Sequence, residues 1–502
     1  MTTVTTLSYR FKINGSYTDS MAAKRGIRQG DPLSPLLFVI TMEYLNRLLC
    51  QMQDNPKFHY HSKCKRIKLT NLIFADDLLL FARGDQGSVE LLQHTLHTFL
   101  VSTGLKVNPS KSCIYFGGVP SSVKDAILHM TSYKEGSLPF KYLGVPITSR
   151  NLNVIHYMPL LDKLLSRINH WTSKLLSYAG RLQLIKSVLN AISSYWMQCF
   201  AFPKIVLKKI ESLCRTFLWT GSGATSRKSP IAWESICKPN IKGGLGTVNL
   251  VAWNCMFLMK LLWNINAKVD SLWVQWVHAY YLKHDSVMVR APKQTDSAIF
   301  KAILQQRDRV QQHNEGQNLL QDNRFNGRKF YKLMQTDCPD VSWANLVIHN
   351  RARSRAVFTL WMLCHRKLPT RMRLHRWGLV HSTVCVFCDQ DETIDHLFFS
   401  CETTKRIWRS VLNWLHIQHD PDCWEHEVLC LLVHYRGKGW RADLTCMALA
   451  ETVYAVWRFR NDKCFGHIVQ SKDIEGDIIN GIVYRGWTSP KLRPHIANLL
   501  IP

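Results

Sequence analysis

Two adjacent carboxylates, Asp76 and Asp77, stand between two short apolar runs of the chain. The runs Leu72–Ala75 and Leu78–Phe81 have the length and composition of strands, and a tight turn would pair them as a β-hairpin with both acids at its tip. Two ionised groups at one turn repel each other unless a cation or hydrogen bonds compensate. Divalent metal is the usual compensation, and nucleotidyl transfer uses that chemistry. A plain exposed Asp-Asp turn is the alternative, because Asp is a favoured turn residue.

A second set of side chains has the composition and spacing of a structural zinc site. The pattern C-x2-C-x7-H-x4-C is formed by Cys385, Cys388, His396 and Cys401. Two cysteines two residues apart can grip one ion from a single turn, and four soft or borderline ligands close a tetrahedral shell. Chance proximity is the alternative, since the chain has 16 Cys.

The elements on the N-terminal side of the acidic turn begin with a basic loop. Glycines and a proline make Arg25–Pro32 irregular, and Ser34 and Pro35 have the character of an N-cap and a first helical residue. The helix would run to about Leu49 with an apolar stripe along one face. Such a loop leading into a rigid helix could hold a nucleotide base and phosphates, although an ordinary capped helix would have the same sequence.

The elements on the C-terminal side alternate helix and strand. Ser88–Thr103 is expected to be an amphipathic helix with Ser88 as its N-cap and Gly104 as its stop signal. A strand over Ser112–Phe116 and a second hairpin bend over Phe140–Ile147 follow. Helices interleaved with hairpins predict an α+β layer, in which helices pack on an antiparallel sheet.

Four motifs in this order, RQGDPLSP, FADD, GLKVNPSK and FKYLGVPI, resemble the palm of a reverse transcriptase. The resemblance is strongest to the type encoded by plant LINE-like, non-LTR retrotransposons. It implies an RNA-directed DNA polymerase with an RNA template and a DNA primer as partners, Mg²⁺ as cofactor and the nucleus as location.

The resemblance also implies a role for individual residues. Asp76 would be a Mg²⁺ ligand with Asp77 beside it, and Lys111 would approach the phosphates of the nucleotide. The residues implied to contact the template and the incoming nucleotide are Gln29, Gly30, Asp31 and Pro32. The bend implied to support the primer end is Tyr142, Leu143 and Gly144.

One carboxylate of the family pattern has no counterpart. Two-metal phosphoryl transfer needs acidic ligands from separate strands, so that two ions sit about 4 Å apart, and the family takes a further Asp from a strand before RQGDPLSP. The only acid before Arg25 is Asp19, in the polar turn Gly15–Ser20. We therefore expect an N-terminally truncated chain with an incomplete polymerase site.

The remainder of the chain divides into further regions. A helical, basic stretch occupies the place of a polymerase thumb, and a Gly/Ser-rich linker at Gly221–Ser226 ends it. The predicted regions are a palm remnant at 1–150, a helical thumb-like region at 151–220, a connection at 221–325, a zinc-binding domain at 326–415 and a helical tail at 416–502.

The region containing the Cys/His pattern has a resemblance of its own. From about Phe330 to Leu415 the sequence resembles the zinc-binding region found C-terminal to plant LINE reverse transcriptases. An arginine-rich stretch before the first Cys contains no Asp or Glu, and Arg351, Arg353 and Arg355 at its start are candidates for nucleic-acid binding. Its aromatics Phe358 and Trp361 are expected to face a core instead.

The last motif lies near the C-terminus. Trp457–Asn461 resembles the segment that often leads into an RNase H domain, and the residues after Phe465 are too few for that domain. We therefore expect the chain to be cut at this end as well.

Composition favours a polyanionic partner. Lysine and arginine number 64 against 36 acids, a net charge of +28, which is more than solubility requires and which nucleic acid would neutralise. A membrane span is not expected, because no apolar stretch approaches 18 residues. The N-terminus lacks the pattern of a secretory signal, and so many Cys then predict reduced thiols in an intracellular protein.

These observations support two main hypotheses. The first is a reverse transcriptase that uses Mg²⁺. The second is a non-catalytic, zinc-stabilised RNA- and DNA-binding protein, which the missing carboxylate favours for this chain. The product of a decayed open reading frame is a third possibility.

Overall fold

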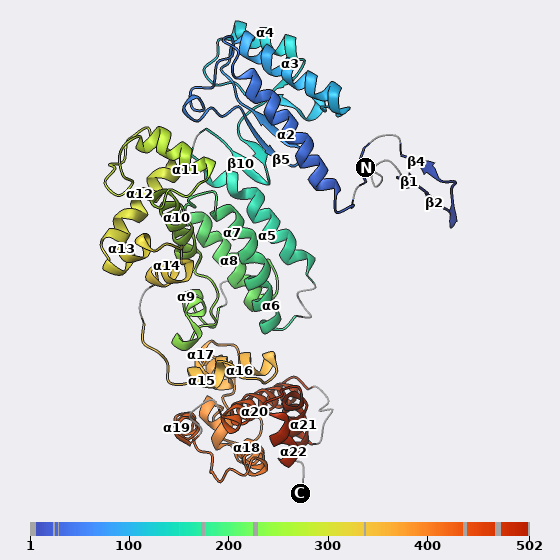
Figure 1. The fold of residues 1–502 in the computed structure, drawn as a ribbon. Helices are drawn as coiled ribbons and strands as arrows, with labels where there is room; N and C mark the ends of the chain where they lie inside the picture. Colours follow the sequence, from blue (N-terminus) through green and yellow to red (C-terminus); the bar gives the residue numbers. More distant parts are fainter. Residues whose placement is uncertain are drawn as a thin grey trace. The chain divides into compact units, whose positions relative to one another are not determined.

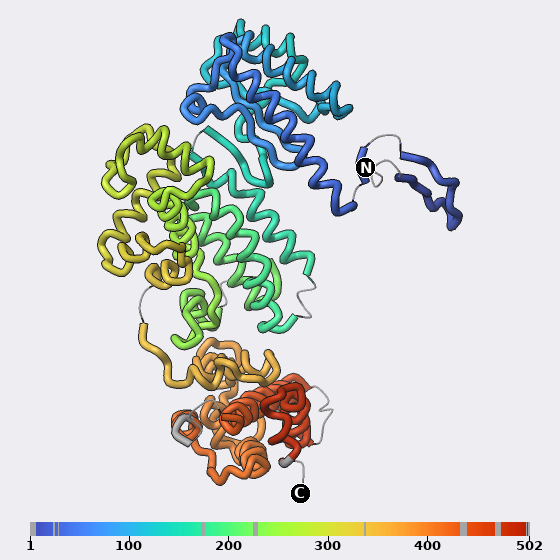
Figure 2. Tube along the Cα trace, in the orientation of Figure 1, coloured from blue at the N-terminus to red at the C-terminus, as the bar shows by residue number. Residues whose placement is uncertain are grey.

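The computed structural model describes residues 7–23, 26–28, 30–149, 151–171, 176–223, 229–335, 338–434, 439–466 and 473–499. The chain forms two compact units, which are described separately (Figures 1 and 2). Unit 1 comprises residues 1–151 and 262–297, and unit 2 comprises residues 152–261 and 298–502.

Unit 1 combines short strands with three longer helices. Its strands are β1 (Ser8–Tyr9), β2 (Lys12–Ile13), β3 (Ser16–Tyr17), β4 (Met21–Ala22), β5 (Asn71–Phe74), β6 (Asp77–Leu80), β7 (Cys113–Ile114), β8 (Lys134–Glu135), β9 (Phe140–Tyr142) and β10 (Val145–Ile147). Its helical elements are α2 (Ser34–Met52), η1 (Lys65–Ile67), α3 (Gln86–Thr103), η2 (Pro109–Lys111), α4 (Ser121–Thr131), α11 (Leu272–Val277) and η7 (His278–Leu282).

The strands of unit 1 form two-stranded sheets. β1 pairs with β4, β2 with β3, β5 with β6 and β9 with β10, all antiparallel, while β7 and β8 are parallel. Both predicted hairpins are confirmed. The predicted strand 112–116 is shorter than expected, because only Cys113 and Ile114 pair with a neighbour.

Helices α2 and α3 pack against each other and cover the acidic hairpin, as Figure 1 shows for α2 and β5. The core of this layer contains Leu45 and Leu49 of α2 and Phe99 of α3, all almost fully buried, with Ile73 and Leu78 of the hairpin packed against them. This arrangement confirms the predicted α+β layer. The first half of α2 differs from a simple buried stripe, because Leu36, Val39 and Ile40 are exposed there.

Both predicted N-caps of these helices are wrong. Asp85 caps α3, because its carboxylate accepts a hydrogen bond from the Ser88 backbone N–H, whereas the Ser88 hydroxyl accepts from the His59 N–H. Ser34 is already inside α2, and its hydroxyl donates to the Arg28 carbonyl. In each case a neighbouring or distant backbone group competes for the side chain that the local pattern assigns to capping.

All named elements of unit 2 are helical, and one of them, α10, continues past residue 261 into the segment assigned to unit 1. Its elements are η3 (Val154–Tyr157), α5 (Met158–His170), α6 (Tyr178–Leu184), η5 (Ile185–Leu189), α7 (Asn190–Met197), α8 (Lys204–Thr220), α9 (Trp233–Cys237), η6 (Asn240–Lys242), α10 (Leu250–Asn266), α12 (Ala298–Gln311), α13 (Asn314–Gln321), α14 (Gly327–Leu333), α15 (Ala344–Val347), α16 (Ser354–Cys364), α17 (Arg371–Arg376), η8 (His396–Ser400), α18 (Glu402–Trp414), α19 (Trp424–His434), α20 (Trp440–Cys464), α21 (Ile474–Trp487) and α22 (Arg493–Leu499).

The C-terminal part of unit 2 is built around α20, which contacts α16, α18 and α21. The side chains of Phe358 and Trp361 on α16 are buried, as the sequence predicted. All sixteen cysteines are free thiols in this structure. Within the described ranges, no helix has both the length and the apolar character needed to cross a membrane.

Candidate metal centre and acidic hairpin

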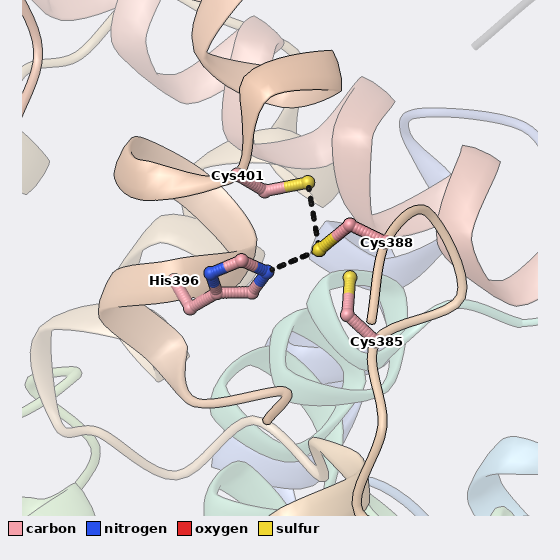
Figure 3. Close-up of side chains that lie close together, drawn as sticks. All are labelled: Cys385, Cys388, His396 and Cys401. Carbon is pink, nitrogen blue, oxygen red and sulfur yellow. Dashed lines mark hydrogen bonds between the residues drawn. The ribbon is translucent and has the colours of Figure 1, made fainter. Parts of the chain in front are cut away.

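The four residues of the Cys/His pattern come together in unit 2 (Figure 3). Their ligand atoms all lie within 4.8 Å of one another. The Cys388 Sγ is 3.0 Å from the His396 Nε2 and 3.9 Å from the Cys401 Sγ. A tetrahedral zinc ion with bonds of about 2.3 Å to sulfur requires neighbouring sulfurs about 3.8 Å apart, so this donor set fits zinc.

Local backbone structure presents the first two cysteines from one tight loop. The base of the loop is closed by a bridge between Val384 and Asp391 and by a hydrogen bond from the Cys385 N–H to the Gln390 carbonyl. The Phe387 N–H donates to the Cys385 Sγ at 3.5 Å. Sulfur that accepts from the backbone in this way suits a metal-bound thiolate.

The other two ligands come from adjoining helical elements. His396 is the first residue of η8, and Cys401 is the N-cap of α18. A hydrogen bond between the Cys385 and Cys401 thiols lowers the pKa of Cys401 and raises the pKa of Cys385. The start of α18 favours the same thiolate, because helix N-termini stabilise negative charge.

A buried ion pair fixes the loop between the ligands to α20. Glu392, midway between Cys388 and His396, is fully buried and receives hydrogen bonds at 2.7 Å from the Arg460 Nη2 and from the Arg371 N–H. The Arg460 side chain is 4% exposed. This contact holds the loop between Cys388 and His396 in place from a helix more than 60 residues away, and no local sequence pattern indicates it.

A smaller group of potential metal ligands lies nearby in the sequence. Asp422, Cys423 and His426 bring three ligand atoms together, and the His426 Nδ1 is 2.8 Å from the Asp422 carboxylate. Asp422 and His426 are exposed. These three residues were not predicted from the sequence.

The acidic hairpin lies in unit 1 with its carboxylates in solvent. Phe74 pairs with Asp77, so Ala75 and Asp76 form the two-residue turn, and Ala75 has a φ of +50° as such hairpin turns require. Asp76 and Asp77 are both exposed. Across the described ranges, neither belongs to a group of three potential metal ligands.

The turn between β9 and β10 lies near this hairpin. Burial and the Asp77 carboxylate together raise the pKa of Tyr142, so the turn of β9–β10 lies within electrostatic reach of the acids. Leu143 and Gly144 form that turn with φ values of +47° and +83°. Lys111 is exposed at the end of η2.

The basic loop before α2 is described only in part. Gln29 lies outside the described residues, while Gly30 has a φ of +91° and precedes Asp31 and Pro32. The Asp31 carboxylate accepts from the Leu33 N–H at 2.8 Å and thereby stabilises the entry to α2.

The three arginines predicted to bind nucleic acid have different environments. Arg351 contacts Asp443 and donates to the Ser489 hydroxyl. Arg353 is paired with the fully buried Glu451. Arg355 is exposed, and no ion pair among the described residues includes it. The stretch is free of acids in sequence, but folding brings carboxylates to it from distant helices.

Two families match separate parts of this chain. Residues 1–147 match the family described as reverse transcriptase (RNA-dependent DNA polymerase). Residues 325–408, which include all four residues of the Cys/His cluster, match the family described as zinc-binding in reverse transcriptase.

Individual relatives agree with these matches. The chain is 30% identical over 129 residues to a putative ribonuclease H protein of Arabidopsis thaliana, covering 26% of this chain and 21% of the relative. It is 29% identical over 294 residues to the retrovirus-related Pol polyprotein of the type-2 retrotransposable element R2DM of Drosophila melanogaster, covering 56% of this chain and 25% of the relative. A 149 kDa protein of transposon TX1 from Xenopus laevis is 28% identical over 216 residues, which is 42% of this chain and 16% of the relative. The matches thus span a quarter or less of each of these relatives.

Proposed function

We propose that this chain binds RNA and DNA with little sequence preference. The chain belongs to the reverse transcriptase family, has the zinc-binding region of that family and is related to non-LTR retrotransposon Pol proteins. The observation that carries this proposal is the net charge of +28. Phosphate backbones are the polyanions that such a surface neutralises with the release of counterions. In this proposal, Cys385, Cys388, His396 and Cys401 hold one structural Zn²⁺ and keep the arginine-bearing region folded.

Binding should weaken steeply with salt. We expect the affinity for a 20-nucleotide single strand, RNA or DNA, to fall by decades between about 50 and 200 mM salt, as it does for proteins that make many phosphate contacts. Fluorescence anisotropy measures this directly. The matched control is a strand of the same sequence with uncharged methylphosphonate linkages, which should bind far more weakly at every salt concentration. Equal affinity for the charged and uncharged strands would contradict the proposal.

Polymerase activity is a second candidate function, favoured by the exposed carboxylates at the tip of the β5–β6 hairpin. Such a site would use Mg²⁺, with Asp76 and Asp77 as ligands. The residues Gln29 to Pro32 and Lys111 would face template and nucleotide, and Tyr142 to Gly144 would support the primer. Two carboxylates on one turn cannot hold two metal ions on either side of a phosphate without a further ligand from another strand.

The purified 502-residue chain is therefore expected to show no template-dependent primer extension with Mg²⁺ or Mn²⁺. Incorporation of labelled nucleotide on an RNA template measures this. If incorporation is found and is lost in Asp76→Ala but kept in Asp125→Ala, an exposed aspartate of α4, the chain is an active polymerase and our expectation is wrong.

A further inference from the structure

A pocket of about 570 Å³ in unit 2 brings four arginines together. It is lined by residues at the start of α6, at the start of α16 and on α20 and α21. The lining residues at the start of α16 and on α20 and α21 include Arg353, Arg355, Tyr454, Arg458 and Arg485. Its volume is within the range of about 300–1,000 Å³ that is typical of small-molecule sites.

The walls of this pocket are fixed by packing between the helices. Tyr178 at the start of α6 stacks on Phe358 of α16 with ring centroids 5.3 Å apart. Helix α20 contacts both α16 and α21. The arginines are therefore carried by elements that hold their backbones in place, which lowers the ordering cost of binding a ligand between them.

Ion pairs between described residues neutralise one of the four arginines, Arg353. The Arg353 Nε donates to the buried Glu451 carboxylate at 2.7 Å, and Asp477 also acts electrostatically on Arg353. No ion pair of the described residues includes Arg355, Arg458 or Arg485, and no Asp or Glu lines the pocket. Three like charges converging without a carboxylate repel one another unless an anion binds between them.

The chemistry of the lining suits a phosphate group. Guanidinium groups present planar pairs of N–H donors that suit phosphate oxygens. Ser354 adds a hydroxyl at the first turn of α16, an 11-residue helix whose N-terminal dipole also favours negative charge.

We propose that this pocket binds a phosphate group, and that its source is the backbone of the bound RNA or DNA strand. The proposal rests on the proposed nucleic-acid binding and names the site at which one or two phosphates are held. Free pyrophosphate presents the same chemistry and is the alternative source.

The test compares two triple variants that change the net charge equally. The pocket variant is Arg355→Gln, Arg458→Gln and Arg485→Gln, and the control variant replaces exposed arginines elsewhere in unit 2, Arg324→Gln, Arg328→Gln and Arg406→Gln. Each removes three positive charges. Only the pocket variant should lower the affinity for a single strand by tenfold or more and flatten the log–log salt slope by about 0.7 for each lost phosphate contact.

Calorimetry with pyrophosphate distinguishes the two sources. Loss of strand binding in the pocket variant, beyond the loss in the control, assigns the pocket to the nucleic acid. Loss of pyrophosphate binding alone assigns it to a free phosphate and overturns the backbone assignment. If the two triple variants match in both assays while the wild type binds nucleic acid, the pocket proposal fails and the proposed function stands. If the wild type binds no strand, the proposed nucleic-acid binding is wrong. The pyrophosphate assay alone then decides whether the pocket binds phosphate.

The single variant Arg458→Gln is a control for misfolding of the triple variant. Its replacement should leave the fold intact, because the Arg458 side chain is exposed on α20. It should reproduce part of the loss in strand affinity with unchanged helix content and unchanged zinc content. An intact Arg458→Gln protein with wild-type affinity and salt slope would count against the proposal.

Discussion

Replacing Cys388 with serine is expected to remove one equivalent of zinc from the protein and to open the segment between Asp389 and Cys401. In the proposed site all four zinc ligands would come from the protein, so no position would remain for water or substrate, and such closed shells mark structural zinc sites. Metal binding supplies folding free energy at such sites, about 10–16 kcal/mol in zinc-finger peptides near pH 7. Zinc content by mass spectrometry and limited proteolysis of the segment measure the two effects.

Cys464→Ser is the matched control, because Cys464 is a partly exposed thiol of the same unit outside both ligand groups. It should keep its zinc and its protease resistance. Chelation of the wild type should expose the same segment while unit 1 keeps its resistance. A wild type without zinc, or a Cys388→Ser protein that keeps the equivalent, would rule the assignment out. If the retained metal is instead lost in Cys423→Ser, it belongs to the group of Asp422, Cys423 and His426.

Local sequence patterns predicted local structure well. The acidic hairpin follows from two apolar runs around a two-residue turn, and the Tyr142–Val145 bend follows from Leu143 and Gly144 in the same way. The Cys/His cluster could be predicted because its ligands are close in sequence and its spacing is characteristic. The predicted helix caps are wrong because distant backbone groups engage the side chains that the local pattern assigns to capping. The Ser88 hydroxyl accepts from the His59 N–H, and Asp85 caps α3 instead.

Long-range contacts could not be predicted from one sequence. The stretch beginning at Arg351 contains no acid, yet Asp443 and Glu451 reach it from α20, more than 90 residues later. Burial of Glu451 reflects the packing of α16 on α20, which no local pattern encodes. Arg458 and Arg485 join Arg355 for the same reason, so only one of the three unpaired arginines of the pocket was identified in advance.

Removal of one partner of the Glu392–Arg460 pair should strongly destabilise the zinc-binding region. Both side chains are almost fully buried, and three hydrogen bonds of 2.7–3.2 Å join them. Arg460→Ala would leave the Glu392 carboxylate buried without its counter-charge. Removing one partner of such a pair costs about 3–5 kcal/mol.

Hydrogen exchange of the Thr383–Cys401 segment measures this loss locally. Because each 1.4 kcal/mol is a factor of about ten, we expect exchange to accelerate by about a hundredfold or more in Arg460→Ala. The matched control is Arg409→Ala, which breaks an arginine–carboxylate contact with Asp420 that is exposed to solvent in the same unit. Exposed pairs contribute little, because water screens them, so this variant should exchange nearly as the wild type does.

A double variant separates the charge from the packing. Glu392→Leu combined with Arg460→Met removes both charges and keeps most of the volume, and such replacements of buried pairs are often close to neutral. Recovery of slow exchange in the double variant would show that the loss in Arg460→Ala comes from an uncompensated carboxylate. Wild-type exchange in Arg460→Ala would contradict the assignment, because Glu392 would then need no partner to stay buried between the zinc ligands.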